Sequence, residues 1–424
     1  MRKGHNKTDR RDFLKSMGSV GLGLVLSSAQ AKAETNEPNA IEPNMPEKPS
    51  KPEFARVPRR RLGKTNVEVP CLALGTNRLD NQIILRAAIK WGVNYWDTAN
   101  SYVGGNSELN IGKYLSSNPE ARKELFIVSK ASGAQKAATA KAIVAKVEER
   151  LQTSLKRMNT EYIDMYYGVH GLEDAEQLND ELKQWVKNAK DRKLIRFFGF
   201  STHKNMGQNL TAAAKLGWVD AIMMSYNFRF MQDDKLQAGI EACHKAGVGL
   251  IAMKTLGFRT GHKVETEEDK KLVSHFLQRG FTEVQAKIKV VLQDNRISTA
   301  CVGMNDVALL KTNAAGALDK TKLTQTDLEA LKKYADATCS SYCAGCAHIC
   351  DSALPKAPYV SEIMRYLMYY NSYGERNKAR ELFTQIPHGI RSQLLSVDYS
   401  SAETYCPQHL PIGRLIAEAV SKLA

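Results

Sequence analysis

The 424-residue sequence lacks several features that mark large classes of protein. Beyond its N-terminal segment it has no apolar run long enough to cross a bilayer, so we expect a mature chain that does not span a membrane. The formal net charge is +15, but Lys and Arg are spread through helix-like stretches and form no basic block with interleaved aromatics. This distribution argues against a nucleic-acid surface. No G-x-G-x-x-G follows the first strand-like run, which disfavours a doubly wound nucleotide-binding sheet.

The segment 1–33 has the order of charge, apolar run and small residues that is typical of an export signal. Arg10 and Arg11 stand shortly before a weakly hydrophobic run at 16–31, which is too short for a membrane span. The segment resembles a twin-arginine signal peptide, and that route exports folded proteins that often carry a cofactor. We therefore predict passage through the twin-arginine translocon to the periplasm or another extracytoplasmic location.

Composition divides the rest of the chain into three parts. Residues 34–58 are rich in Pro, Glu and Asn without periodicity, and they are predicted to form a linker. Residues 59–320 follow one repeating pattern and are predicted to form the main folded domain. Residues 321–424 contain a cysteine-rich segment and are predicted to form a separate extension.

Eight apolar, strand-like runs alternate with amphipathic, helix-like stretches in the main domain. The runs are CLALGT, VNYWDT, LFIVSK, YIDMYYGVH, IRFFGFST, AIMMSYNF, GLIAMK and STACVG. This alternation predicts parallel strands joined by crossover helices. Eight strand–helix units in about 250 residues match the size of a (β/α)8 TIM barrel, in which the eight parallel strands close into one cylindrical sheet. In such a barrel the functional side chains lie at the C-terminal ends of the strands.

Four titratable residues fall at or just after the ends of neighbouring runs. Asp97, Lys130 and His170 end the second, third and fourth runs, and Tyr102 follows Asp97 in the loop. A tyrosine can donate a proton to a carbonyl oxygen if a lysine stabilises its phenolate, while aspartate holds the lysine and histidine orients the substrate. The set suits the reduction of a carbonyl by hydride transfer. Lys254, which ends the seventh run, is a further candidate without an assigned role.

The segments DTANSYVGGNSELNIG, FIVSK and YYGVH resemble, in order and spacing, the catalytic segments of the aldo/keto reductases over roughly 59–318. The resemblance implies an NAD(P)-dependent oxidoreductase acting on a small carbonyl or alcohol, such as an aldehyde or a sugar. It implies a catalytic tetrad made of Asp97, Tyr102, Lys130 and His170. A non-catalytic nucleotide-binding or redox-sensing protein on the same barrel is the alternative.

The resemblance also implies positions for the nicotinamide cofactor. Tyr226 matches the aromatic residue that stacks on the nicotinamide, and Ser201 matches a polar residue near its carboxamide. Gly303 and Asn313 match the segment that holds the adenine end. Asp306 stands where a basic residue often meets the 2′-phosphate of NADP, and a carboxylate would repel that phosphate. NAD is therefore slightly favoured.

The stretch CSSYCAGCAHIC at 339–350 and the later Cys406 resemble the ferredoxin-type tail attached to some aldo/keto reductases. Such tails carry two C-x2-C-x2-C-x3-C-P motifs that hold iron–sulfur clusters. The second motif retains one cysteine here, so the resemblance implies a single [4Fe–4S] cluster and leaves Cys350 over. The implied ligands are Cys339, Cys343, Cys346 and Cys406.

Four alternatives for these cysteines remain open. Cys350 could replace Cys406, or four thiolates could bind zinc. An exported chain could form disulfides such as one between Cys343 and Cys350, or the tail could be degenerate and hold no cluster. A cluster would also imply a redox partner. The remaining cysteines are predicted to be ordinary buried residues: Cys71, Cys243 and Cys301.

Overall fold

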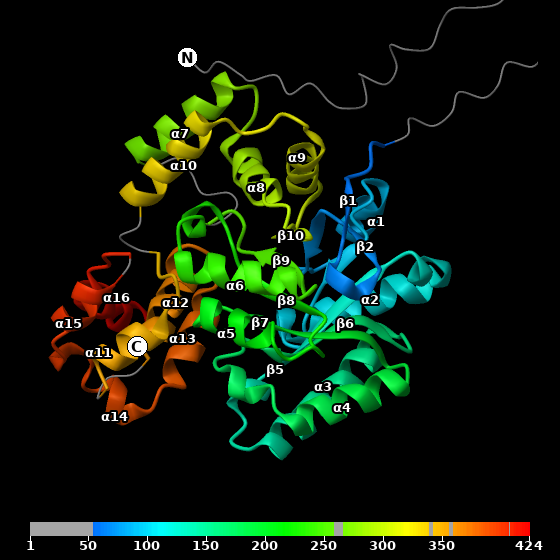
Figure 1. Cartoon of the computed structure of the whole chain (residues 1–424), viewed down its shortest axis with the longest axis horizontal. Helices are drawn as coiled ribbons and strands as arrows, with labels where there is room; N and C mark the ends of the chain where they lie inside the picture. Colours follow the sequence, from blue (N-terminus) through cyan, green and yellow to red (C-terminus); the bar gives the residue numbers. More distant parts are fainter. Residues whose placement is uncertain (1–53, 258–265, 339–341, 356–358, 407) are drawn as a thin grey trace, which may run out of the picture. The chain divides into compact units, whose positions relative to one another are not determined.

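The strands of the main domain close into the parallel barrel that the alternating runs predict. The computed structural model describes residues 54–257, 266–338, 342–355, 359–406 and 408–424 (Figure 1). The strands are β3 (Leu72–Gly75), β4 (Tyr95–Asp97), β5 (Phe126–Ser132), β6 (Ile163–His170), β7 (Ile195–Thr202), β8 (Ala221–Ser225), β9 (Gly249–Met253) and β10 (Thr299–Gly303). Each is parallel to its neighbours, and β10 pairs with β3 to close the barrel. The predicted signal peptide, and the linker up to residue 53, lie outside the described residues.

Helices cover the outside of the barrel, as Figure 1 shows. They are α1 (Ile83–Lys90), α2 (Asn106–Ser117), α3 (Ala140–Met158), α4 (Asp180–Asp191), α5 (Met206–Ala213), α6 (Asp234–Lys245), α7 (Glu267–Gln278), α8 (Glu283–Gln293), α9 (Val307–Leu318) and α10 (Gln325–Ala337). The sequence marks their ends. For α3, the Thr139 side chain accepts a hydrogen bond from the Ala142 N–H, and Asn159 ends the helix in the left-handed region. None of the helices in the described part of the chain is long and apolar enough to cross a membrane.

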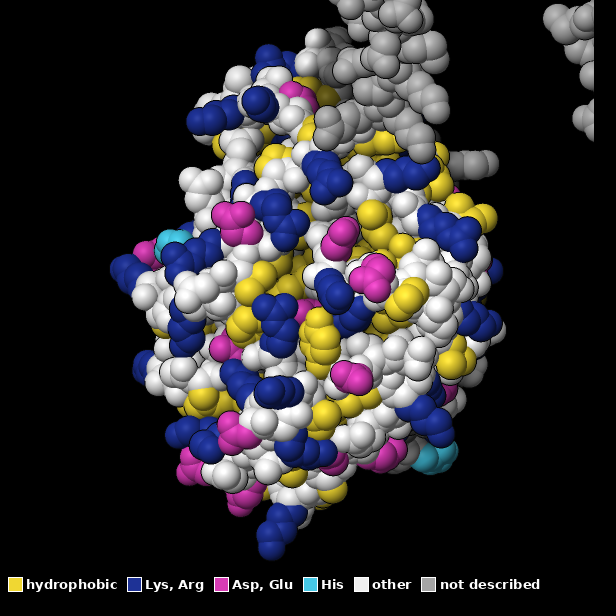
Figure 2. Space-filling model, turned by 90° about the vertical axis from the view of Figure 1, so that its right-hand side faces the viewer, with side chains coloured by type: hydrophobic (Ala, Val, Ile, Leu, Met, Phe, Trp, Pro, Cys, Tyr) yellow, Lys and Arg dark blue, Asp and Glu magenta, His cyan; other side chains and the backbone are white. Residues whose placement is uncertain are grey.

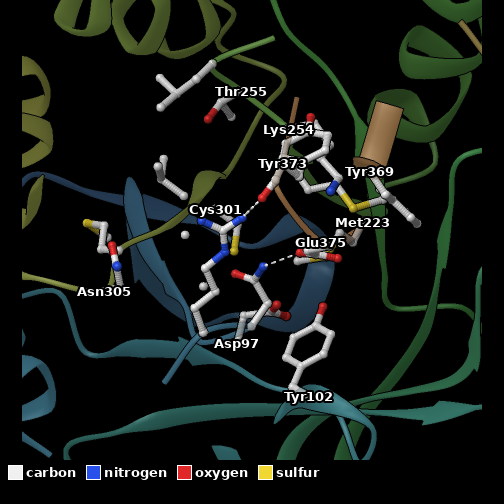
Figure 3. Close-up of a pocket in the computed structure, with 18 of the residues that line it drawn as sticks. Asp97, Tyr102, Met223, Lys254, Thr255, Cys301, Asn305, Tyr369, Tyr373 and Glu375 are labelled. Carbon is white, nitrogen blue, oxygen red and sulfur yellow. Dashed lines mark hydrogen bonds between the residues drawn. The ribbon is translucent and has the colours of Figure 1, made fainter. Parts of the chain in front are cut away.

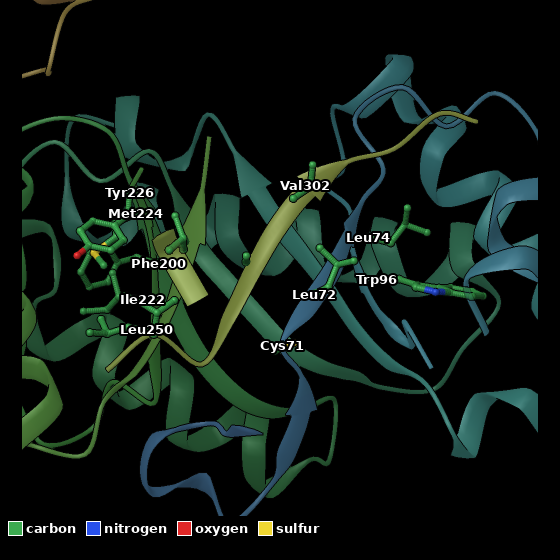
Figure 4. Close-up of a cluster of buried hydrophobic side chains, with 14 of the residues drawn as sticks. Cys71, Leu72, Leu74, Trp96, Phe200, Ile222, Met224, Tyr226, Leu250 and Val302 are labelled. Atoms are coloured by element: carbon green, nitrogen blue, oxygen red, sulfur yellow. The ribbon is translucent and has the colours of Figure 1, made fainter. Parts of the chain in front are cut away.

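Alternation along each strand separates an inner from an outer apolar layer. Inward side chains such as Tyr95, Tyr167 and Met223 fill the barrel. Outward side chains pack under the helices, and Figure 4 shows part of this outer cluster. The hairpin of β1 (Arg59–Arg61) and β2 (Glu68–Pro70) contributes Val69 to the inner core. The inner core is thus packed, and open space remains only toward the strand ends.

A second set of helices follows the barrel and has its own apolar core. They are α11 (Ala347–Ala353), α12 (Val360–Asn371), α13 (Arg376–Thr384), α14 (His388–Arg391), α15 (Ser400–Tyr405) and α16 (Ile412–Leu423). By contrast, α10 belongs with the barrel layer, because Tyr334 donates a hydrogen bond to Asp269 of α7 at 2.7 Å. The separate core therefore begins with the cysteine segment.

On the face shown in Figure 2, basic side chains are interspersed with acidic and uncharged ones.

The extension docks against the C-terminal ends of the barrel strands. Lys204, just after β7, pairs with Glu362 of α12 at 2.7 Å. Arg365, also on α12, donates to the His203 carbonyl at 3.0 Å. This is the face of the barrel at which the candidate catalytic residues were expected.

Candidate active site

Asp97 and Lys130 form a buried ion pair across two neighbouring strands. Lys130 Nζ lies 2.6 Å from Asp97 Oδ1 and donates a second hydrogen bond to the Thr98 carbonyl at 2.7 Å. The side chains are 0% and 4% exposed. Burial raises the pKa of Asp97, and the charge of Lys130 opposes that shift without cancelling it. The pair thus places fixed, opposite charges directly beneath the mouth of the barrel.

Tyr102 lies beside this pair, in the turn that follows β4. Its ring centroid is 4.8 Å from Lys130 Nζ. Removal from bulk water raises its pKa well above the ordinary value, and the negative charge of Asp97 adds to this. From the sequence we expected a tyrosine made more acidic by its lysine. In the structure, burial and the charge of Asp97 outweigh the nearby positive charges, and the hydroxyl is a weaker acid than an exposed tyrosine.

Backbone geometry after Tyr102 explains the sequence YVGGN. Val103, Gly104 and Gly105 all have positive φ, at 51°, 63° and 96°. A side chain at Gly105 would lie within 2.6 Å of the Arg157 guanidinium, which donates to the Asn100 carbonyl at 2.7 Å. Glycine is therefore required at this position by both conformation and space. The turn aims Tyr102 back over the strand ends.

His170 ends β6 and faces Tyr102, with the ring centroids 6.2 Å apart. Its Nδ1 is 2.9 Å from Ser201 Oγ, which also accepts a hydrogen bond from the Gly171 N–H at 3.0 Å. Burial lowers the pKa of His170 well below its ordinary value, and Lys130 lowers it further. The imidazole is therefore neutral. With Nδ1 held by Ser201, Nε2 is the nitrogen that can meet a substrate oxygen.

Asp97, Tyr102 and His170 line one pocket with a volume of about 160 Å³, shown in Figure 3, while Lys130 is fully buried and reaches the pocket through its ion pair with Asp97. The ends of the remaining strands complete the pocket with Gly75, Met223, Met253, Lys254, Cys301 and Gly303. A larger cleft of about 1280 Å³ shares Tyr102 and His170 with it. The structure thus brings all four predicted catalytic residues together.

The extension supplies part of the pocket wall, which the sequence did not indicate. The residues that it contributes are Tyr369, Tyr373, Glu375 and Lys378. Arg78 donates to the Tyr373 carbonyl, and Asn77 Nδ2 donates to Glu375 Oε1 at 3.5 Å, as the dashed lines in Figure 3 show. Lys378 Nζ pairs with Glu375 at 3.0 Å, and its charge opposes the upward shift in the Tyr102 pKa.

The structure differs from the sequence-based expectation for Tyr226. Its ring belongs to the outer apolar cluster (Figure 4), and its hydroxyl donates to Asp294 Oδ2 at 2.7 Å. Met223 faces the pocket from β8, and Tyr226 directly follows the last residue of that strand, Ser225. If the alternation of β8 continues by one residue, Met223 and Tyr226 point to opposite sides, because they are an odd number of residues apart.

The other predicted cofactor residues occupy three different settings. Gly303 lines the pocket, whereas Ser201 is buried and holds His170. Asn313 is fully buried in α9, and neither of its amide atoms has a hydrogen-bond partner among the described residues. Asp306 caps α9 by accepting a hydrogen bond from the Leu309 N–H at 2.8 Å. Thr255, which also lines the pocket, has a buried hydroxyl without a described partner.

The described cysteines of the extension surround a second, small cavity. Its cysteine lining is Cys343, Cys346, Cys350 and Cys406. Cys350, which the sequence-based ligand set leaves out, also lines this cavity, because α11 places it at the same space as Cys406. Cys339 lies outside the described residues. Helix α12 lines both spaces, with Val360 and Met364 at the cysteines and Tyr369 at the active-site pocket.

The cysteines around this cavity do not form a metal site as they stand. Within the described ranges, no group of three or more His, Cys, Asp or Glu side chains is arranged so that it could hold a metal ion. None of the described cysteines is in a disulfide. Burial raises the pKa of Cys343 to about 11 and that of Cys350 to about 12, so both thiols are neutral as they stand.

The three predicted ordinary cysteines are all buried, but one also faces the active site. Cys71 and Cys243 belong to the outer apolar cluster. Cys301, on β10, points into the barrel and lines the pocket next to Asp97. Burial and the charge of Asp97 raise its pKa well above the ordinary value, so the thiol is neutral.

Comparisons with known proteins match the barrel to one family. Residues 72–338 match the model of the aldo/keto reductase family. Among solved structures, the chain is similar to the aldo-keto reductase AKR11C1 from Bacillus halodurans in its holo form (TM-score 0.52, 21% identity, 66% of this chain and 96% of that one). It is also similar to the thermostable aldo-keto reductase Tm1743 in complex with the inhibitor epalrestat (TM-score 0.53, 25% identity, 65% and 99%). Both shared regions leave about a third of this chain unmatched.

Proposed function

Because this chain belongs to the aldo/keto reductase family, we propose that it catalyses reversible hydride transfer between NAD(P) and a carbonyl or alcohol substrate. One observation carries the proposal: the buried Asp97–Lys130 pair lies under Tyr102, and His170 faces the same ring. This arrangement provides a proton donor, a fixed cation and a neutral hydrogen-bonding group at one point.

In the direction of reduction, Tyr102 gives its proton to the carbonyl oxygen. The hydroxyl is protonated at neutral pH, and the phenolate that remains after proton transfer is stabilised by the positive charges of the nearby Lys130 and Lys378, which offset the effect of burial. His170, held at Nδ1 by Ser201, orients the substrate oxygen. In the direction of oxidation the phenolate of Tyr102 takes the proton back.

The nicotinamide cofactor supplies or accepts the hydride when it is bound. The residues available to hold it are Gly303 and Thr255 at the pocket, together with Asn313 behind β10. A buried amide or hydroxyl without a partner is costly, so the unpaired polar atoms of Thr255 and Asn313 support a ligand there. The carboxylate of Asp306 disfavours a 2′-phosphate nearby and slightly favours NAD.

Replacing Tyr102 by Phe tests the proposed reaction. We expect NADH-dependent aldehyde reduction to fall by about a hundredfold to ten-thousandfold, because the proton donor is lost while the ring remains. Loss of NADH absorbance measures turnover, and fluorescence titration measures the nucleotide Kd, which should stay within a few-fold. Tyr162→Phe, which removes a hydroxyl on the outside of the barrel beside Arg122, is the control. Equal activity in the Tyr102→Phe protein would reject the assigned role.

We also propose that the extension holds one [4Fe–4S] cluster, which exchanges electrons with a redox partner. The convergence of four described cysteines on one cavity supports this. Cys343, Cys346 and Cys406 are the proposed ligands common to the sequence-based and structural sets. The fourth ligand is Cys350 or Cys339, and the position of Cys350 at the cavity supports the former.

Export by the twin-arginine route is proposed from the N-terminal segment alone. We expect the double substitution Arg10→Lys and Arg11→Lys to leave the precursor in the cytoplasm, because that translocon reads the arginine pair. Immunoblots of periplasmic and cytoplasmic fractions from a Gram-negative host measure the distribution. Lys3→Ala removes charge from the same segment and should leave export intact. A doubly substituted chain recovered from the periplasm at the level of the unaltered chain would contradict the proposal.

A further inference from the structure

A second histidine, His203, lies at the active-site pocket in a setting that repeats that of His170. Both side chains line the pocket together with Tyr102. Nδ1 of His203 is 2.8 Å from Ser225 Oγ, and this contact repeats the one between His170 and Ser201. Burial lowers the pKa of His203 well below its ordinary value. The pocket therefore holds two neutral imidazoles, each with its Nδ1 held by a serine.

The loop directly after β7 is held by the extension at each of its three residues. At the first residue, Arg365 of α12 donates a hydrogen bond to the His203 carbonyl at 3.0 Å. At the second, Lys204 pairs with Glu362 of the same helix at 2.7 Å. The third residue contacts the cysteine segment. The position of the loop therefore depends on the extension as well as on the barrel.

That third residue, Asn205, binds the segment 343–348, which carries two of the cysteines around the small cavity. The Asn205 N–H donates to the Gly345 carbonyl at 3.0 Å. Its Oδ1 accepts two hydrogen bonds from His348, one from the backbone N–H and one from Nδ1, each at 3.0 Å. Asn205 has a φ of 47°, in the left-handed region that asparagine adopts more readily than most residues. Three hydrogen bonds to one segment hold it there.

Gly345 is the point at which the cysteine segment meets the backbone of the loop. It has a φ of 78°, and a Cβ at this position would overlap the His203 carbonyl oxygen and lie 3.2 Å from the Arg365 guanidinium. Glycine is therefore required here by both conformation and space. The Gly345 N–H also donates to Cys343 Sγ at 3.4 Å. A single residue thus connects a thiol of the cysteine cavity with an active-site histidine.

The same loop is tied to the strand end that holds His170. Ser201 contacts the imidazole of His170, and its carbonyl accepts a hydrogen bond from the Leu172 N–H at 2.7 Å. Thr202 follows, and its Oγ1 lies 3.0 Å from the Leu172 carbonyl and 2.9 Å from the Lys204 carbonyl. A displacement of the loop would therefore reach both histidines of the pocket.

We propose that the segment 343–348 positions the two histidines of the active site, and that Asn205 is the positioning residue through which it acts. The inference rests on the proposed oxidoreductase function, because it concerns groups that orient the substrate there. It gives the extension a part in the reaction that is separate from any electron transfer. Weakening the contacts of Asn205, or displacing Gly345, misplaces both imidazoles and leaves Tyr102 in position.

Two substitutions of Asn205 test the contact from the side of the barrel. Glycine tolerates the left-handed conformation but removes the acceptor for His348, whereas aspartate keeps an acceptor oxygen. With NADH and glyceraldehyde, we expect kcat of Asn205→Gly to fall by about tenfold to a hundredfold, and Asn205→Asp to keep most of it. The NADH Kd should stay within a few-fold. Asn159→Gly is the matched control, because Asn159 has the same φ of 47° and donates to Ser116 Oγ, and it should keep full turnover.

Gly345→Ala tests the contact from the side of the extension. Its Cβ would push the cysteine segment away from the His203 carbonyl, so we expect a similar loss of kcat. Gly280→Ala is the matched control, because Gly280 also has a positive φ, at 83°, but has no atom within 4 Å of an added Cβ. It introduces the same backbone strain without the displacement. If Gly345→Ala fails to fold, the two Asn205 variants decide.

Modification by diethyl pyrocarbonate reports on the histidines without turnover. Peptide mass spectrometry gives the rate at each imidazole, and we expect the rates at His203 and His170 to rise several-fold in Asn205→Gly and Gly345→Ala. Asn205→Asp and both controls should keep the original rates. This result supports the inference even if no chain reduces glyceraldehyde, in which case the reaction alone would be rejected.

Three results would overturn the inference. The first is an unchanged modification rate at both histidines in Asn205→Gly. The second is an equal defect in Asn205→Gly and Asn205→Asp, because the acceptor oxygen would then have no part in it. The third is full turnover in Asn205→Gly despite faster modification, because the histidines would then need no positioning.

Discussion

Replacing Lys130 by Met is expected to destabilise the fold by about 3–5 kcal/mol and to lower turnover by a hundredfold or more. The ammonium of Lys130 is 0% exposed and lies 2.6 Å from Asp97. Its removal leaves a buried carboxylate without a counter-charge. It also removes the fixed cation beneath Tyr102, so the phenolate that forms in reduction loses its stabilisation. Urea unfolding measures the first effect, and NADH-coupled aldehyde reduction measures the second.

The pH dependence of this destabilisation identifies its cause. Burial already raises the pKa of Asp97, and loss of Lys130 should raise it further. Protonation then relieves the variant as the pH falls from the raised pKa toward the ordinary aspartate value of about 3.9, below which the carboxyl is protonated in the folded and the unfolded chain alike. The loss in the free energy of unfolding should therefore be largest at neutral pH and shrink in acid. A loss that is independent of pH would show that packing, not charge, is responsible.

A double variant separates stability from catalysis at this pair. Lys130→Met combined with Asp97→Leu removes both charges, and we expect it to recover most of the stability but none of the activity. Lys123→Met is the matched control, because that lysine is 82% exposed and pairs only with the exposed Glu120. It should change the free energy of unfolding by less than about 1 kcal/mol.

Replacing Cys406 by Ser is expected to abolish the iron–sulfur cluster. Cys406 is far in sequence from Cys343 and Cys346, yet all three line one cavity, so its loss leaves only the cysteines of the segment 339–350 to bind iron. Anaerobic purification with iron and sulfide analysis should give about four irons per unaltered chain and near none in the variant. Visible absorption provides a second measure. A Cys406→Ser chain with full iron would reject this ligand.

The pair Cys350→Ser and Cys339→Ser decides the fourth ligand. The position of Cys350 at the cavity leads us to expect cluster loss from the first substitution and retention in the second. Cys243→Ser is the control, because Cys243 lies in the outer cluster of the barrel. A cluster that is kept in Cys350→Ser and lost in Cys339→Ser would instead identify Cys339 as the fourth ligand, as the ferredoxin-type motif implies.

The barrel, and the clustering of the four candidate catalytic residues, could be read from the sequence because their signals are local. Each strand is one short apolar run, and parallel strands bring their ends to one face whatever the details of packing. Asp97, Lys130 and His170 were recognised as site candidates from one feature alone, their position at the ends of strand-like runs. Tyr226 could have been placed correctly by the same means, since alternation from the inward Met223 puts it outside.

The residues that the extension contributes to the pocket could not be predicted from the sequence. Tyr369 and Lys378 lie more than two hundred residues beyond Tyr102, and no periodicity relates them. Their position depends on how two separately packed cores meet, through contacts such as Lys204 with Glu362. Contacts of this kind arise from tertiary packing, which leaves no pattern in either segment alone.

Helix α12 has a consequence for how the protein matures. One end of the helix lines the cysteine cavity and the other forms a wall of the catalytic pocket. If the extension holds the proposed cluster, an insertion step that moves α12 would also move a wall of the pocket. If the chain is also exported folded, as proposed, the cluster would be inserted and the pocket completed before export.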